Sequence, residues 1–79
     1  MDNIKNRQFY IKKIKKLFEL IDSDDSENAN KELDELKKDY EIIEDDLFGV
    51  LVRIESFLLK SENISLNDIK SEFNSVLNN

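Results

Sequence analysis

Cysteine, histidine, proline and tryptophan are absent from this sequence of 79 residues, and glycine occurs once, at Gly49. Without cysteine the chain forms no disulfide, and without cysteine or histidine it lacks the ligands of a structural zinc site. The missing histidine also removes the side chain that most often acts as a general base near neutral pH. We therefore expect a protein that is not an enzyme and that needs no cofactor.

The acidic segment DSDDSENANKEL is the stretch whose spacing comes nearest to a calcium-binding loop. Asp22, Asp24 and Ser26 stand at the first, third and fifth positions of an EF-hand-like loop. Glu27 then occupies the position that requires glycine, and Leu33 the position that requires a bidentate glutamate. The segment fits better as an acidic cap at the positive end of a helix, so we expect no metal site.

Long hydrophobic runs are missing too, and no stretch approaches the roughly 18 apolar residues of a membrane span. The basic N-terminus leads into FYIKKIKKLF, in which lysines interrupt any hydrophobic region of a signal peptide. We expect one helical domain over residues 1–79, located in the cytoplasm. The core of so short a chain is small, and without a disulfide or zinc only another chain could add to it.

Charged residues are abundant but unevenly placed. The net charge is −6, from 12 basic and 18 acidic side chains. Residues 1–21 carry six basic and two acidic side chains, whereas residues 22–48 carry three basic and twelve acidic ones. A basic segment is therefore followed by an acidic one, and each is a candidate surface for a partner of opposite charge.

Apolar residues recur at helical spacing through most of the chain and predict an all-α fold. Nine of them alternate steps of four and three residues in an unbroken, coiled-coil-like heptad pattern: Ala29, Leu33, Leu36, Tyr40, Ile43, Leu47, Val50, Ile54 and Phe57. Because the pattern continues through Gly49, it favours one helix over residues 26–60, in which the glycine costs about 1 kcal/mol. With further helices at about 4–21 and 66–77, we expect an antiparallel helical hairpin with a long second helix and a short C-terminal helix.

The alternative is a compact four-helix bundle, in which the chain turns near residues 44–49. Short helices are more common than long ones. The sequence near residues 44–49, however, lacks the signals that mark the other two boundaries between helices. Asp24 is placed to cap the second helix, with Glu27 three residues later, and Ser65 is placed to cap the last helix. No glycine or asparagine closes a helix just before residues 44–49.

Three apolar residues, Phe48, Val52 and Leu59, lie opposite the heptad stripe. In a compact monomer they would be ordinary core residues. In the long-helix fold they form a surface between molecules, most simply a homodimer in which two long helices pack together. We favour the homodimer, because the chain is small and has no disulfide or zinc to stabilise it.

Each charged segment presents a candidate binding face. Acidic side chains on the outside of the long helix form the candidate surface for a basic region of another protein: Asp34, Glu41, Glu44 and Asp45. Lysines along the first helix form a candidate anion-binding stripe: Lys5, Lys12, Lys15 and Lys16. Nucleic acid is the weaker hypothesis for these lysines, because the protein is acidic overall and has no groove-reading motif. Solubility alone is the simpler explanation of either face.

In size and all-helical character the chain resembles small bacterial or phage accessory proteins, including bacteriocin immunity proteins, antitoxins and phage inhibitors of host defence. The segment LVRIESFLLKSENISLNDIKSEF, a helix, a cap and a helix, is similar to the C-terminal half of pediocin-like immunity proteins, which are four-helix bundles. The continuous heptad pattern does not fit that topology, so no residue roles are carried over.

The sequence therefore predicts a small, acidic, non-catalytic protein-binding module of the inhibitor, antitoxin or immunity type. It would act as a homodimer on a basic protein surface. The alternatives are a helical dimer that associates with RNA or DNA through its lysine stripe, an immunity-like four-helix bundle, and a purely structural subunit of a larger assembly.

Overall fold

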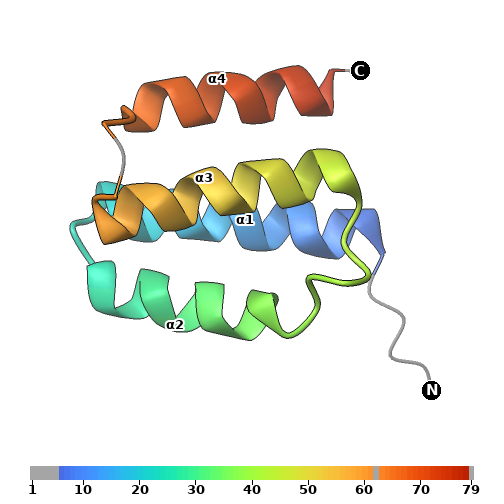
Figure 1. The fold of residues 1–79 in the computed structure, drawn as a ribbon, viewed down its shortest axis with the longest axis horizontal. Helices are drawn as coiled ribbons and strands as arrows, with labels where there is room; N and C mark the ends of the chain where they lie inside the picture. The colour runs from blue at the N-terminus through green and yellow to red at the C-terminus, as the bar shows by residue number, and fades with distance from the viewer. Residues whose placement is uncertain (1–5, 62, 79) are drawn as a thin grey trace.

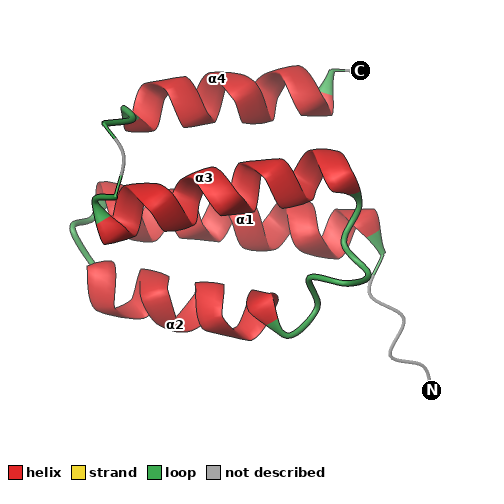
Figure 2. Cartoon of the chain, viewed as in Figure 1, coloured by secondary structure: helices red, strands yellow, loops and turns green. Residues whose placement is uncertain are grey.

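The computed structural model describes residues 6–61 and 63–78, which form four α-helices and no strand (Figure 1). The helices are α1 (Arg7–Asp22), α2 (Ser26–Lys37), α3 (Asp45–Leu59) and α4 (Leu66–Leu77). Short loops join them, and α3 lies between α2 and α4 in the view of Figure 2. The predicted all-α fold is confirmed, and of the two predicted architectures the structure has the compact four-helix bundle.

Polar side chains cap the beginnings of the first and last helices. Asn6 accepts a hydrogen bond of 3.1 Å from the backbone N–H of Phe9, which starts α1. Ser65 accepts one of 3.1 Å from the N–H of Asp68 and starts α4 at the residue predicted from sequence. Residues 4 and 5, the first two of the helix predicted over about 4–21, lie outside the described residues.

The residue that caps the second helix is one position later in the sequence than predicted. Asp25, not Asp24, caps α2 by accepting a hydrogen bond of 3.3 Å from the N–H of Asn28. Asp24 instead has a left-handed backbone with φ 61°, and the N–H of Asp25 donates to the carbonyl of Leu20. This arrangement closes the C-terminus of α1, because a left-handed residue turns the chain out of a helix.

The long helix predicted over residues 26–60 is wrong. α2 ends at Lys37 and α3 begins at Asp45, and residues 38–44 form the α2–α3 connection that reverses the chain (Figure 1). The heptad residues nevertheless face the core on both sides of the connection, since Leu36, Ile43 and Leu47 are all buried. The apolar spacing therefore predicted correctly which residues are buried, but it did not predict that the helix is interrupted.

The α2–α3 connection turns without glycine and without a left-handed residue among its own members. The N–H groups of Lys38, Asp39 and Tyr40 donate to carbonyl groups three residues earlier, at 2.9–3.3 Å, so the last turn of α2 tightens. Glu44 then becomes extended, with φ −63° and ψ 147°. The turn folds α3 and α4 back onto α1 and α2, and this packing covers apolar surface that a straight helix would leave open in a single chain.

Gly49 does not interrupt a helix. It lies in the second turn of α3, so the prediction that a helix continues through this residue is confirmed. A Cβ atom added at Gly49 would meet nothing within 4 Å outside the backbone of the helix itself. The glycine is therefore required neither for a turn nor for close packing.

The core is built from apolar side chains of all four helices. Its most fully buried large members are Ile14, Leu17, Leu33, Leu47, Val50, Leu51, Ile54 and Ile69. The rings of Phe18 in α1 and Phe73 in α4 lie 5.6 Å apart between centroids and close the core between the first and last helices. No helix within the described ranges has both the length and the apolar character needed to cross a membrane.

The helices pack mainly in sequence-adjacent pairs. α1 has its most extensive contact with α2, and α3 has its most extensive contact with α4. We call these pairs the N-terminal hairpin and the C-terminal hairpin. The α2–α3 connection is the segment that joins them.

Candidate functional site

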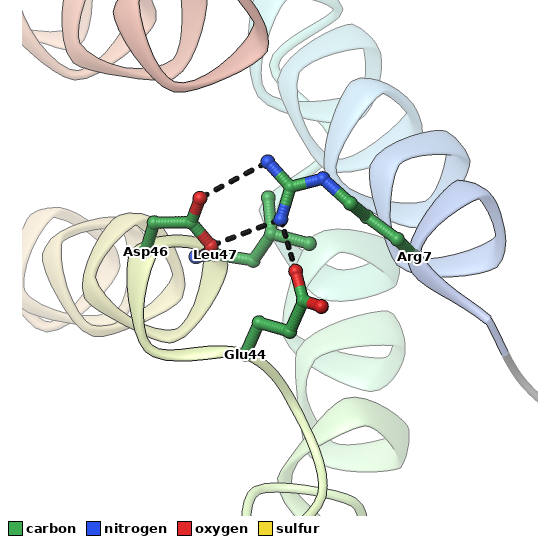
Figure 3. Close-up of polar contacts among 4 residues, drawn as sticks. All are labelled: Arg7, Glu44, Asp46 and Leu47. Atoms are coloured by element: carbon green, nitrogen blue, oxygen red, sulfur yellow. Dashed lines mark hydrogen bonds and ion pairs between the residues drawn. The ribbon is translucent and has the colours of Figure 1, made fainter. Parts of the chain in front are cut away.

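Arg7 joins the beginning of α1 to the beginning of α3 (Figure 3). Its guanidinium donates two hydrogen bonds of 3.0 Å to the carboxylate of Asp46 and a further one to Glu44. A guanidinium that faces a carboxylate through two parallel bonds is among the stronger and more directional ion pairs. These bonds fix the position of the α2–α3 connection against α1.

The ion pairs shift the pKa of both partners. The hydrogen bond from Arg7 lowers the pKa of Asp46, and the backbone N–H of Leu47 adds to this effect, although burial opposes it. The hydrogen bonds to Asp46 and then to Glu44 raise the pKa of Arg7. Both partners are therefore charged at neutral pH.

A cluster of negative charge lies at this end of the bundle. Residues 39–46 contain five acidic side chains and no basic one, and they occupy the α2–α3 connection and the first turn of α3. Arg7 offsets one of these charges. Glu41 and Asp45 are exposed, and neither forms an ion pair within the described part of the chain. We call residues 39–46 the acidic end.

Ile42 is an exposed apolar side chain in the middle of the acidic end. It is 65% exposed, whereas the adjacent Ile43 is 6% exposed. The sequence carried a signal for this, because only Ile43 of the two isoleucines fits the heptad pattern. An apolar side chain surrounded by polar ones has the arrangement of an anchor residue in a protein interface.

Three of the four acidic residues predicted to bind a partner lie at the acidic end, namely Glu41, Glu44 and Asp45. Glu44 is already bound to Arg7 (Figure 3). The fourth, Asp34, is exposed within α2, and its carboxylate lies 3.8 Å from the ammonium of Lys37. The structure thus gathers three of the predicted residues and leaves Asp34 apart from them.

The residues predicted to form a dimer interface do not share one environment. Phe48 is half-buried against the core, and its ring meets that of Tyr40 edge to face with centroids 4.9 Å apart. Val52 is 38% exposed and Leu59 is 66% exposed, both on α3. Phe48 therefore packs within its own chain, while the other two are accessible to a second chain. The homodimer stays a prediction.

The predicted lysine stripe of α1 is only partly available to bind an anion. Lys5 is outside the described residues, while Lys12, Lys15 and Lys16 are exposed. Lys16 lies 3.4 Å from the carboxylate of Glu32 in α2. Lys12 and Lys15 form no ion pair within residues 6–61 and 63–78.

Glu32 of α2 forms ion pairs with two lysines of α1 and so links the two helices. Lys13 lies 3.2 Å from its carboxylate, beside the contact from Lys16. Burial raises the pKa of Glu32, but the hydrogen bonds and positive charges of Lys13 and Lys16 together lower it by more, so the pKa falls below its usual value. One predicted anion-binding lysine is thus engaged by an acidic side chain of the same molecule.

The candidate calcium loop is used for packing and capping. Asp22 lies 2.8 Å from the ammonium of Lys70 in α4, and Asp25 caps α2. Within the described residues no group of three or more acidic side chains is placed to hold a metal ion.

Comparisons with known proteins assign the chain to no family. No protein-family model matches it, and neither does any curated protein or solved structure. The function is therefore argued from the geometry of the acidic end.

Proposed function

We propose that the protein is a non-catalytic binding module that uses its acidic end to dock on a basic surface of another protein. The observation that carries this proposal is the exposed Ile42, which lies within a segment of five acidic and no basic residues. Charge of one sign steers a partner of opposite charge and orients it. An apolar side chain at the centre of such a surface adds affinity once water is excluded.

The ion pairs within the chain favour particular residues for contact with the partner. Arg7 engages Glu44 and Asp46, so these two carboxylates hold the connection in place. Glu41 and Asp45 are left to receive lysine or arginine side chains of the partner. A module of this kind acts by occupying its partner's surface, as an inhibitor, an antitoxin or an immunity protein would, and we propose a role of this type in the cytoplasm.

A pair of charge-reversed variants tests the proposal. The tagged protein is used to capture partners from an extract of its native host, and the affinity of the captured protein is then measured as a function of salt. We expect Glu41→Lys/Asp45→Lys to lose the partner, and binding by the wild type to weaken as salt increases. Ile42→Ser should weaken binding without altering the net charge.

The matched control is Glu19→Lys/Glu27→Lys. It reverses the same number of charges at exposed positions of α1 and α2, away from the acidic end. Each variant reverses one acidic residue in the first turn of a helix, Asp45 in α3 and Glu27 in α2, so the loss of helix-dipole stabilisation is similar. Equal capture by both variants would contradict the proposal.

A further inference from the structure

The α2–α3 connection contains no residue that forbids a continuous helix. Residues 38–44 include neither glycine nor proline, and the left-handed residues of the described chain, Asp24 and Lys60, lie elsewhere. Glu44 precedes α3 without a side-chain capping bond. Helix formation across the connection would therefore meet no obstacle from the residue types present.

The apolar pattern already fits such a helix. The steps of four and three residues from Ala29 to Phe57 pass through the connection without a shift. If α2 and α3 became one helix, their core residues would still form a single stripe. An insertion or deletion of one residue in the connection would instead turn the stripe of α3 by about 100° relative to that of α2.

The packing of the bundle divides at the same place. Straightening the connection would leave each hairpin intact, because α1 packs mainly on α2 and α3 mainly on α4. It would separate the contacts between the hairpins, such as the Phe18 and Phe73 rings and the ion pair of Asp22 with Lys70. A second copy of the chain carries the same faces and can restore these contacts.

We propose that two copies of this chain associate by exchanging their C-terminal hairpins. In the exchanged dimer, residues 26–59 form one helix in each copy, and α4 of one copy packs on α1 of the other. The contacts between hairpins are the same as in the single chain, so the two forms differ mainly in the connection and in the entropy of association. The dimer is therefore favoured at high protein concentration.

Glu44 provides the variants that separate the two forms. Its φ of −63° suits proline, and its N–H makes no hydrogen bond within the described residues. Proline at residue 44 therefore fits the φ of Glu44 in the closed connection and removes no hydrogen bond there, but it would break the continuous helix. Glu44→Ala removes the same ion pair with Arg7 and favours a helix, which makes it the matched control.

The oligomeric state is measured by light scattering across a sizing column, after each protein has been refolded from denaturant at high concentration. We expect dimers from the wild type and a larger dimer fraction from Glu44→Ala. Glu44→Pro should raise the dimer dissociation constant about hundredfold or more relative to Glu44→Ala. Equal dimer fractions in these two variants, or no dimer in either, would overturn the proposal.

Single cysteines then identify which hairpins touch, since the chain has none of its own. Chains with Asp22→Cys are refolded together with chains carrying Lys70→Cys, because these positions meet across the two hairpins. Arg53→Cys with Glu72→Cys is the control pair, because these positions meet within the C-terminal hairpin. A bifunctional thiol reagent about as long as a lysine side chain joins the cysteines, because both ion pairs are made through long lysine or arginine side chains. Exchange predicts a cross-link between chains for the first mixture only.

The face-to-face homodimer predicted from the sequence gives a different result. It would dissociate on Val52→Glu and would form no cross-link between the Asp22→Cys and Lys70→Cys chains. That outcome would overturn the exchanged dimer. The exchange test uses no other protein, so its result is independent of whether the acidic end binds a partner.

Discussion

Arg7 and Asp46 are 39 residues apart in sequence, and their side chains meet through two hydrogen bonds of 3.0 Å. Asp46→Asn keeps the oxygen that accepts from the N–H of Leu47 but removes the charge. Both side chains are substantially exposed, so we expect only a small favourable coupling free energy. Urea unfolding of the wild type, Arg7→Met, Asp46→Asn and the double variant measures it, and additive effects would contradict the prediction.

The same pair predicts how stability depends on pH. Because the folded-state pKa of Asp46 lies below the usual value of 3.8, the carboxylate stabilises the fold above that pH. This contribution is lost as the pH falls through the lowered value. The difference in unfolding free energy between the wild type and Asp46→Asn should therefore shrink in acid and also in high salt. A difference that stays constant from neutral pH downward would contradict this.

Gly49→Ala should stabilise the protein. The position is inside α3, and an added Cβ meets nothing within 4 Å beyond the helix backbone. The gain in helix propensity is about 1 kcal/mol. Thermal unfolding followed by circular dichroism measures it, with Ser71→Ala on the exposed side of α4 as a control that should gain about half as much. A lower melting temperature for Gly49→Ala would contradict the prediction, because it would mean that the helix does not accommodate the added Cβ.

Lys60→Gly should stabilise the protein as well. Lys60 ends α3 in a left-handed conformation with φ 57°, which disfavours a side chain but suits glycine. We expect a gain of about 1 kcal/mol in unfolding free energy. Lys12→Gly, in the middle of α1, should lose about the same amount, so the two lysine-to-glycine changes should have opposite signs. Destabilisation by both would contradict the left-handed assignment.

Two tyrosines should respond oppositely to removal of the hydroxyl group. The hydroxyl of Tyr40 is buried without a hydrogen-bond partner in the described structure, and burial, with the charge of Glu55, raises the pKa of Tyr40 to about 12. Tyr40→Phe should raise the unfolding free energy by about 1 kcal/mol. Tyr10 donates to Asp39 at 3.2 Å, so Tyr10→Phe should lower it by about 1 kcal/mol. A loss of stability in both variants would indicate that Tyr40 has a partner in solution.

Local signals in the sequence predicted local features of the fold correctly. The serine cap at Ser65 starts α4, and the stripe that includes Leu47 and Ile54 is the core face of α3. The helix also continues through Gly49 as its surroundings indicated. These features depend on residues within one or two turns of each other, where spacing and capping are informative.

Features that depend on packing between distant segments could not be predicted in the same way. Residues 38–44 contain no glycine or proline that would mark the end of a helix. The chain turns there because α3 and α4 then bury apolar surface against α1 and α2. The Arg7 ion pairs follow from that turn, so nothing near Arg7 in the sequence indicated them. The site prediction named Glu41, Glu44 and Asp45, which the structure places at the acidic end, but it omitted both Arg7 and Ile42.

The pairing of sequence-adjacent helices also bears on how the protein folds. Each hairpin forms from contacts that are close in sequence, so little chain entropy is lost before apolar burial begins. Helical proteins with such low contact order fold in about microseconds to milliseconds. During synthesis α1 and α2 leave the ribosome first and can pair before α3 has been made, so the N-terminal hairpin is the template on which the rest of the core is completed.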